Sequence, residues 1–312
     1  MPLSLRRGTV TAIAERHEEL VRLEVDGVSC IAYPRLTGPV ELGDEVLVNV
    51  QARELGLGSG GFDVLHANLT RGLVLEAEPD AHVMALPYTP LQYAVHHVEE
   101  DGQLADSLAG MPVVCCSIHS QVVPVCAALA DLRVAYVQVP GGALPVALSD
   151  AVRALRERML IDLAVAAGPC VDADAQAVNV YSALAWCAAK KAEVAVCSVG
   201  PGIVGTGTTL GHGGVAAAQA ANAAAALGGR AVIAPRVSKA DPRDRHRGRS
   251  HHTETVLRLC LVEPYVPAGG EPGWREACAG LPLSQMGRGP EEDPDFFAAA
   301  FAAGRLARSL VS

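Results

Sequence analysis

The residues best suited to chemistry are concentrated in one short segment, from Asp241 to Thr253. Its thirteen residues include four arginines, three histidines and two aspartates. Arginine binds carboxylate or phosphate through two parallel hydrogen bonds, and histidine gains or loses a proton near neutral pH. The composition of the segment therefore predicts a site that binds an anion and either moves a proton or holds a metal ion.

Within this segment we expect the arginines to contact the anion while one histidine acts as a general acid or base. We expect Asp241 to orient the imidazole of that histidine. The candidates for catalysis are His246, His251, His252, Asp241 and, from an earlier segment, His119. The candidates for ligand binding in and beside the segment are Arg236, Ser238, Arg243, Arg245, Arg247 and Ser250. The plain alternative is a solvated basic surface loop.

A second segment, residues 200–214, holds seven glycines and three threonines in fifteen residues. Backbone N–H groups next to glycine can wrap an anion, and a helix that starts near Val215 adds its positive end. This pattern favours phosphate binding, with contacts expected from Gly200, Gly202, Gly205, Thr206, Gly207 and Thr208. The alternative is a loop that needs glycine only to turn sharply.

Two other functions remain open at this point. Gly200, Gly202 and Gly205 have the spacing of a dinucleotide-binding loop, but Pro201 interrupts it and no acidic residue ends the following strand. Under that alternative the chain is an NADP-dependent oxidoreductase in which Arg236 binds the 2′-phosphate. Under the other it is a non-catalytic sensor or assembly protein that binds a nucleotide or metabolite.

A metal ion is not favoured by the spacing of the histidines. His251 and His252 are adjacent, so they point in different directions on a regular element, and no zinc-protease spacing is present. The cofactor is therefore unknown. The alternative, a divalent cation, would take a mixed ligand set drawn from His119, His246, His251, His252, Asp172 and Asp174.

The elements that must position these residues are predicted from about residue 78 onward. Apolar runs alternate there with alanine-rich stretches, which is typical of parallel strands covered by helices on both faces. We expect strands at 112–118, 134–139, 160–165, 193–199 and 230–234, and helices at about 174–190, 215–227 and 294–310. Ligands bind beyond the carboxyl ends of such strands, so the two segments share one pocket if the fourth and fifth strands are neighbours.

Residues 1–77 show a different pattern, with short alternating strands and tight turns. Short antiparallel strands of this kind predict a small β-barrel. The expected architecture is α/β: an N-terminal barrel domain, 1–77, followed by a doubly wound, mostly parallel sheet domain, 78–312. Barrel modules often mediate assembly, and we expect a homo-oligomer.

Composition limits the class of protein. Half of the 312 residues are hydrophobic and 19% are charged, which is enough for packed cores. The net charge of −9 argues against a nucleic-acid partner, because binding to the phosphate backbone needs a positive surface. We also expect no membrane partner and a cytoplasmic location, since no signal or spanning segment is evident. The nine cysteines lie mostly in apolar runs, as buried thiols do.

Several motifs together resemble an uncharacterised bacterial protein family, a domain of unknown function. The matching residues are His82-Val-Met-x-Leu86, Tyr88-Thr-Pro-Leu-Gln92, His119-Ser-Gln121, the loop from Gly200 to Thr208, and Arg245-His-Arg-Gly-x-Ser-His-His-Thr253. The resemblance implies a shared site and a bacterial cytoplasmic setting but no reaction. Residues 168–172 depart from the family pattern, where a histidine and more glycine are expected. From the residues themselves we expect an enzyme that hydrolyses or transfers a group on a phosphorylated or otherwise anionic small molecule.

Overall fold

The computed structural model describes residues 3–56, 61–72, 75 and 78–311. The chain divides into two compact units, Met1–Ala94 and Val95–Ser312. The domain boundary expected near residue 77 lies outside the described residues.

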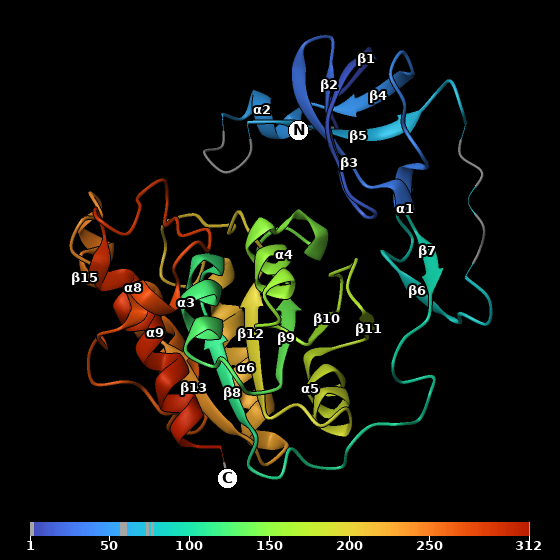
Figure 1. Cartoon of the computed structure of the whole chain (residues 1–312). Helices are drawn as coiled ribbons and strands as arrows, with labels where there is room; N and C mark the ends of the chain where they lie inside the picture. Colours follow the sequence, from blue (N-terminus) through green and yellow to red (C-terminus); the bar gives the residue numbers. More distant parts are fainter. Residues whose placement is uncertain (1–2, 57–60, 73–74, 76–77, 312) are drawn as a thin grey trace. The chain divides into compact units, whose positions relative to one another are not determined.

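The first unit contains a closed five-stranded barrel in the order β1-β2-β3-β5-β4, which confirms the predicted small barrel (Figure 1). Inward-facing residues such as Val10, Leu23 and Val46 are buried in its core. The β3–β5 pair is parallel, whereas we expected antiparallel strands. A closed ring of five strands cannot alternate direction at every pair, so one parallel pair is unavoidable. The elements of this unit are β1 Leu5–Arg16, β2 Val21–Val25, β3 Val28–Ala32, α1 Pro34–Thr37, β4 Glu45–Asn49, α2 Gln51–Glu54, β5 Asp63–Asn68, β6 Val83–Ala85 and, ending at its boundary, β7 Tyr93–Val95.

The second unit is built on a six-stranded, all-parallel sheet in the order β11-β10-β9-β12-β8-β13, which confirms the predicted α/β class. The five expected strands are present, and β11 was not predicted. The expectation that the fourth and fifth predicted strands are neighbours is wrong, because β8 lies between β12 and β13. The strands are β8 Pro112–Cys116, β9 Val134–Val139, β10 Leu163–Ala167, β11 Ala175–Ala177, β12 Val194–Val199 and β13 Arg230–Ala234.

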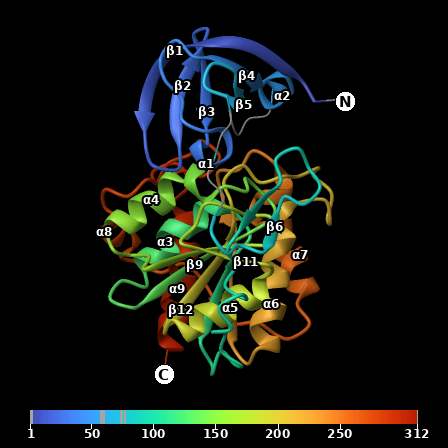
Figure 2. The ribbon, with the colours of Figure 1, turned by 90° about the vertical axis from the view of Figure 1, so that its right-hand side faces the viewer.

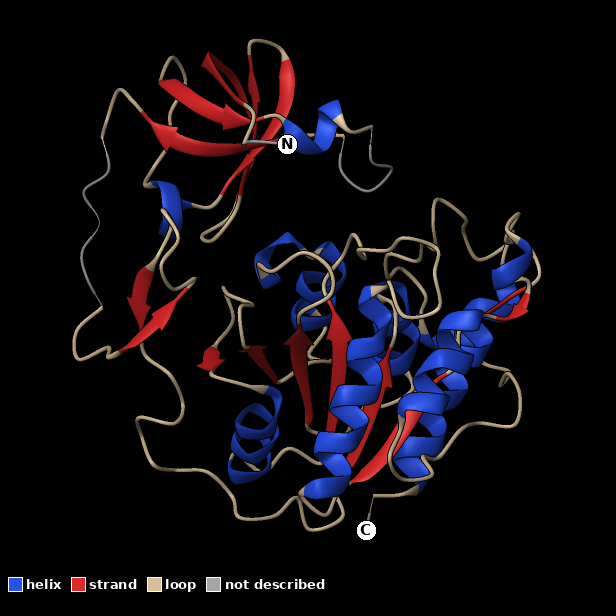
Figure 3. Ribbon diagram, turned by 180° about the vertical axis from the view of Figure 1, so that it is seen from behind, coloured by secondary structure: helices blue, strands red, loops and turns tan. Residues whose placement is uncertain are grey.

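Helices cover both faces of the sheet, as Figures 2 and 3 show from two sides. Along β8, Val114 and Cys116 pack under α3, α4 and α9, while Val113 and Cys115 pack under α5, α6 and α7. This alternation is the period of two that a strand buried on both faces requires. The helices are α3 Val122–Ala127, α4 Asp150–Glu157, α5 Val180–Ala189, α6 Ala216–Ala226, α7 His251–Leu259, α8 Trp274–Ala277 and α9 Pro294–Ser309. Shorter elements are η1 His119–Gln121, η2 Val146–Leu148, η3 Gly213–Val215, η4 Asp244–His246, β14 Val237–Ser238 and β15 Gly248–Arg249.

Two of the three predicted helices are confirmed. Helix α6 ends before Gly228, whose φ of +74° is the left-handed conformation of a glycine cap. Helix α9 buries Phe296 and Phe297, as its apolar face predicts. The helix expected from residue 174 begins only at Val180, since residues 175–177 pair with β10 instead.

The first turn of α5 is capped by one side chain. Oδ1 of Asn179 accepts hydrogen bonds from the backbone N–H groups of Tyr181 (2.9 Å) and Ser182 (3.1 Å). Replacing Asn179 with alanine removes this cap, and we expect the free energy of unfolding to fall by about 1 kcal/mol. Urea denaturation measures the loss. Asn179→Ser is the control, since its hydroxyl still caps; equal losses in both variants would show that capping is not the cause.

The nine cysteines are all free, and eight of them are buried, as the sequence predicts. Burial raises the pKa of the Cys187 thiol to about 12, so this thiol is neutral at physiological pH. Within the described part of the chain, none of the helices combines the length and the apolar character needed to cross a bilayer.

Candidate functional site

The loops that follow β12 and β13 meet, although β8 separates the two strands. The ring of His212, from the first loop, stacks on the ring of His252 with centroids 3.7 Å apart. At the exposed tip of the same loop, a Cβ atom added at Gly207 would lie 3.4 Å from Nη2 of Arg245. The two segments therefore lie against each other. The segments after the strands bring them together, although the strands themselves are not neighbours.

The centre of the site is a group of four imidazoles, which we call the histidine cluster: His212, His246, His251 and His252. His251 lies 4.5 Å from His252 and 4.8 Å from His246 between ring centroids. Three of the four side chains are buried, and His251 is half-buried. Sequence reasoning missed His212, and the available signal was a histidine inside the glycine-rich loop directly before a helix.

Ser250 positions two of the imidazoles. Its hydroxyl accepts a hydrogen bond from the backbone N–H of His252 (3.1 Å), which caps α7, and it lies 2.7 Å from Nδ1 of His246. His212 directly precedes η3 and α6, and η3 packs against α7. The amino ends of two helices, with their partial positive charge, therefore converge on the cluster.

Beside the cluster lies a buried charge network centred on Asp241. Its carboxylate accepts hydrogen bonds from Arg236 (3.1 Å), Arg243 (2.9 Å to each oxygen) and Arg288 (3.2 Å). Asp241 is 1% exposed, and the hydrogen bonds from Arg243 hold the pKa of its carboxyl well below the usual range. Asp241 was expected to orient an imidazole; within the described residues its hydrogen bonds go instead to arginines and to the backbone N–H of Arg243.

Asp293 extends this network from the start of α9. Its Oδ2 accepts hydrogen bonds from the hydroxyl of Ser238 (2.6 Å) and from Arg288 (3.3 Å), and its side chain makes no capping hydrogen bond to the helix. Ser238 also accepts a hydrogen bond from the backbone N–H of Asp241 (3.0 Å). Ser238, a candidate for ligand binding, therefore links the backbone of Asp241 to the carboxylate of Asp293.

The imidazoles are held neutral by their surroundings. Burial, with Arg236 and Arg243 next in effect, lowers the pKa of His246 to about 3. Burial, together with His212 and Arg236, lowers the pKa of His252 to about 2. The pKa values of His212 and His251 are also lowered, first by burial. A neutral imidazole offers one nitrogen lone pair to a proton or a metal ion.

The candidate arginines have different partners. Arg243 is engaged by Asp241, and exposed Arg247 pairs with Asp244 at 3.4 Å. Arg245 is exposed, lies over Gly207 and is close enough to His251 to lower its pKa. Arg245 is thus the arginine that lies between the glycine-rich loop and the histidine cluster.

The glycine-rich loop is a hairpin held by its own threonines. The hydroxyls of Thr206 and Thr208 lie 2.9 Å apart, and the backbone N–H of Thr206 donates to Gly211 O at 2.7 Å. Gly200 has a packing role, since a Cβ there would lie 2.1 Å from the carbonyl oxygen of Ala143. Gly202 and Gly207 have positive φ, which fits a tight turn, while Gly205 pairs with His212.

The other candidates have their own partners. The ring nitrogens of His119 contact the carbonyl oxygen of Val199 (3.0 Å) and the hydroxyl of Ser149 (2.7 Å), and burial lowers its pKa to about 4. Asp174 pairs with Arg156 at 2.6 Å just before β11, the edge strand opposite β13. Asp172 lies in the same loop, with a positive φ. In the described part of the chain, neither His119 nor Asp172 nor Asp174 belongs to a group of possible ligands close enough to share one metal ion.

The environment of Arg236 bears on the NADP alternative. Arg236 is 2% exposed, donates to Asp241, and its Nη1 lies 3.4 Å from Nδ1 of His252. A guanidinium that binds a 2′-phosphate must reach the cofactor, and this one is enclosed by the charge network. The geometry does not favour the oxidoreductase alternative.

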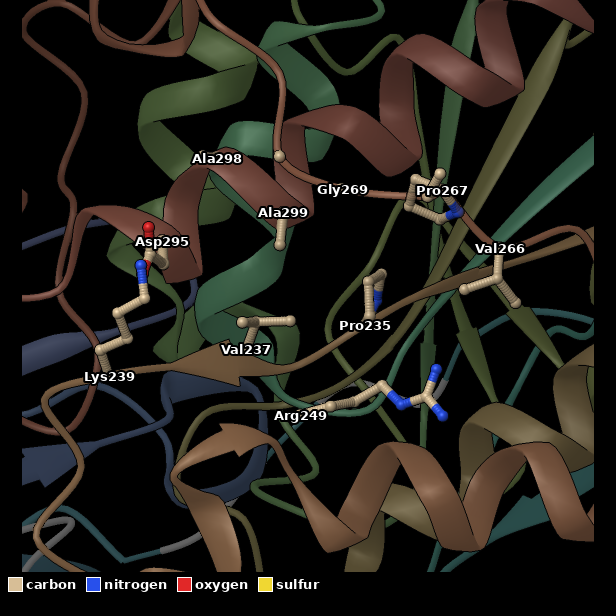
Figure 4. Close-up of a pocket in the computed structure, with 12 residues that line it drawn as sticks. Pro235, Val237, Lys239, Arg249, Val266, Pro267, Gly269, Asp295, Ala298 and Ala299 are labelled. Atoms are coloured by element: carbon tan, nitrogen blue, oxygen red, sulfur yellow. The ribbon is translucent and has the colours of Figure 1, made fainter.

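A pocket of about 340 Å³ lies beside the β14–β15 hairpin, which contributes Val237 and Arg249 to its lining (Figure 4). Its lining is largely apolar, and its charged groups are paired: Lys239 with Asp295 at 2.7 Å, and Arg249 with Glu254. None of the residues expected at the site lines this pocket. We therefore assign the candidate site to the histidine cluster and its arginines.

Comparison with known proteins gives one finding on family. The model of a family described as "Protein of unknown function (DUF3866)" matches residues 29–272, which include both loops of the site. The curated proteins contain no match to the chain.

Proposed function

The chain therefore belongs to the DUF3866 family, and we propose that it is an enzyme that hydrolyses or transfers a group on a phosphorylated or otherwise anionic small molecule. The observation that supports the proposal is the meeting of Arg245, the histidine cluster and the amino ends of α6 and α7 beside the glycine-rich loop. These groups are all suited to an anion or to proton transfer.

The charge balance supports an anionic ligand. Arg236, Arg243 and Arg288 carry three positive charges against the two negative charges of Asp241 and Asp293, and Arg245 adds another. The helix amino ends add partial positive charge at the same place. The imidazoles add no negative charge, so an anion would balance the excess positive charge.

In the proposed division of roles, Arg245 and backbone N–H groups of the glycine-rich loop bind the anion. The N–H groups of Val204 and Thr206 are excluded, because they donate to Gly141 O and Gly211 O. One imidazole of the cluster, from His246, His251 or His252, takes the proton from the attacking water or hydroxyl group as the new bond to the substrate forms. The bond to the leaving group breaks at the same centre, and the leaving group departs with the electron pair and takes up a proton from solvent. Backbone and guanidinium donors that already point at the developing negative charge stabilise the transition state.

The first test compares two exposed arginines of one loop. Hydrogen bonds between a guanidinium and an anion contribute roughly 1.5–3 kcal/mol, so we expect Arg245→Ala to weaken binding of pyrophosphate by about tenfold to a hundredfold. Arg247→Ala is the matched control, because Arg247 pairs with Asp244. Isothermal titration calorimetry measures both. The same affinity for Arg245→Ala as for the unmodified chain would contradict the assignment of the anion site.

Turnover separates an enzyme from a sensor. The unmodified chain is incubated with a broad panel of phosphorylated metabolites and nucleotides, and phosphate release or group transfer is followed by phosphorus NMR. Conversion of a panel member supports the enzyme proposal. Tight binding without conversion across the panel favours the non-catalytic sensor.

A further inference from the structure

We propose that His212, His251 and His252 form a binding site for one divalent transition-metal ion of the Zn²⁺ class. One ring nitrogen from each of the three lies within 4.8 Å of the others. Two of these histidines come from the start of α7 and the third from the loop before α6. The metal site does not depend on the proposed function, because its evidence is the arrangement of imidazoles and not of arginines.

The second observation is that buried nitrogen atoms in this group have no hydrogen-bond partner in the described part of the chain. This holds for both ring nitrogens of His212, which is 4% exposed, and for Nε2 of His251. Leaving a buried polar atom without a partner costs about 1–3 kcal/mol, so such atoms are rare in native structures. Several in one cluster indicate that a ligand completes their bonding.

The chemistry of the donor set selects a metal ion. Imidazole nitrogen is a preferred ligand for Zn²⁺ and related ions, and three protein ligands with one position left for water or substrate is the pattern of catalytic zinc sites. Each imidazole would coordinate the ion through the lone pair of its neutral ring.

Adjacent histidines can both reach such an ion here because they occupy the first turn of α7, facing the loop that carries His212. In a tetrahedral site with Zn–N of about 2.1 Å, ligand nitrogens lie about 3.4 Å apart. Binding therefore requires the imidazoles to turn, which separates the stacked rings of His212 and His252. The contact between Arg236 and His252 is long, at 3.4 Å, and does not lock that ring.

The nearby arginines favour binding of an anion together with the metal ion. Arg236 and Arg245 repel a bare cation, so an anion that binds beside the ion should raise its affinity. This part rests on the proposed function. It predicts that Zn²⁺ binds more tightly in the presence of inorganic phosphate, and that a metal-bound water would face the bound anion.

The experiment measures metal binding directly. The full-length chain is treated with chelator, dialysed and titrated with Zn²⁺ and with Co²⁺, without any substrate. Bound metal is counted by elemental analysis, and tetrahedral Co²⁺ is recognised by its visible absorption. We expect one ion per chain for the unmodified protein, a loss of at least tenfold in affinity for His212→Ala and His251→Ala, and no change for the control His66→Ala in the barrel.

Circular dichroism confirms that each variant is folded. Failure of the folded, unmodified chain to bind Zn²⁺ or Co²⁺ at a one-to-one ratio overturns the proposal, as does unchanged binding in folded His212→Ala and His251→Ala. If the chain binds phosphate or pyrophosphate but binds no metal ion, the metal site is removed and the proposed function stands. If the chain binds the metal ion but binds no anion, and phosphate does not change the metal affinity, the proposed function is removed and the metal site stands.

Discussion

Replacing Asp241 with asparagine is expected to lower the free energy of unfolding by about 3–5 kcal/mol, because it leaves buried arginines without their carboxylate. Asp241 is 1% exposed and accepts hydrogen bonds from Arg236, Arg243 and Arg288. Asparagine has nearly the same shape but no charge, and its amide group would face other donors. Denaturation in urea measures the loss.

Asp244→Asn is the control for this prediction. Asp244 lies three residues away, its side chain is 93% exposed, and its ion pair with Arg247 is on the surface. Such pairs contribute roughly 0–1 kcal/mol. If the two variants lose the same free energy of unfolding, the buried hydrogen bonds of Asp241 do not stabilise the fold more than a surface ion pair does.

The same network should resist acid. The pKa of Asp241 is lowered in the folded state, so its contribution is fully present above the ordinary carboxyl value of 3.8 and is lost only as the pH falls toward the lowered value. The difference in stability between the unmodified chain and Asp241→Asn should therefore persist from neutral pH down to about pH 4.

The second large effect is expected for Gly213→Ala. A Cβ at this position would lie 1.9 Å from the carbonyl oxygen of Gly141 and 2.6 Å from its carbon, so the two loops must move apart. Both are backbone atoms and cannot be relieved by rotating a side chain. Overpacking of this kind costs about 1–3 kcal/mol, and we expect the upper end because the overlap is with backbone atoms of Gly141. Thermal denaturation at matched concentration measures it.

Gly205→Ala provides the matched control in the same loop. Its added Cβ would have its nearest contact 3.7 Å away, at Cβ of His212, which is an ordinary distance. We expect its stability to stay within about 0.5 kcal/mol of the unmodified chain, as at most surface positions. If both substitutions destabilise the protein equally, the loop does not tolerate an added side chain at either position. The close contact between Gly213 and Gly141 would then not be the cause of the loss in Gly213→Ala.

Much of the fold could be predicted from local pattern. Strands buried on both faces need continuous apolar runs, and these placed β8, β9, β12 and β13 to within two residues. Proline at the start of α9 and glycine after α6 marked helix ends through conformational preferences that belong to single residues. Strand β11 and the late start of α5 could not be found in this way, because residues 175–177 are strand only through pairing with β10.

The site was predicted in part. The arginine-rich and glycine-rich segments were both recognised from composition, and the structure brings them together. The roles within them were less predictable: Asp241 and Ser238 hold buried arginines and a second carboxylate, and His119 bonds to Val199 and Ser149. A side chain's partner depends on residues far away in the chain, such as Arg288 and Asp293, which no local pattern connects.

Hydrophobic period and residue type are local properties, so the residues were enough to predict a β-barrel, a parallel α/β sheet, and cationic and glycine-rich segments after two strands of that sheet. The cluster that His212 forms with His246, His251 and His252 could be seen only in the folded chain. It forms because η3 packs against α7, which brings together the segments that follow β12 and β13 although β8 lies between the two strands.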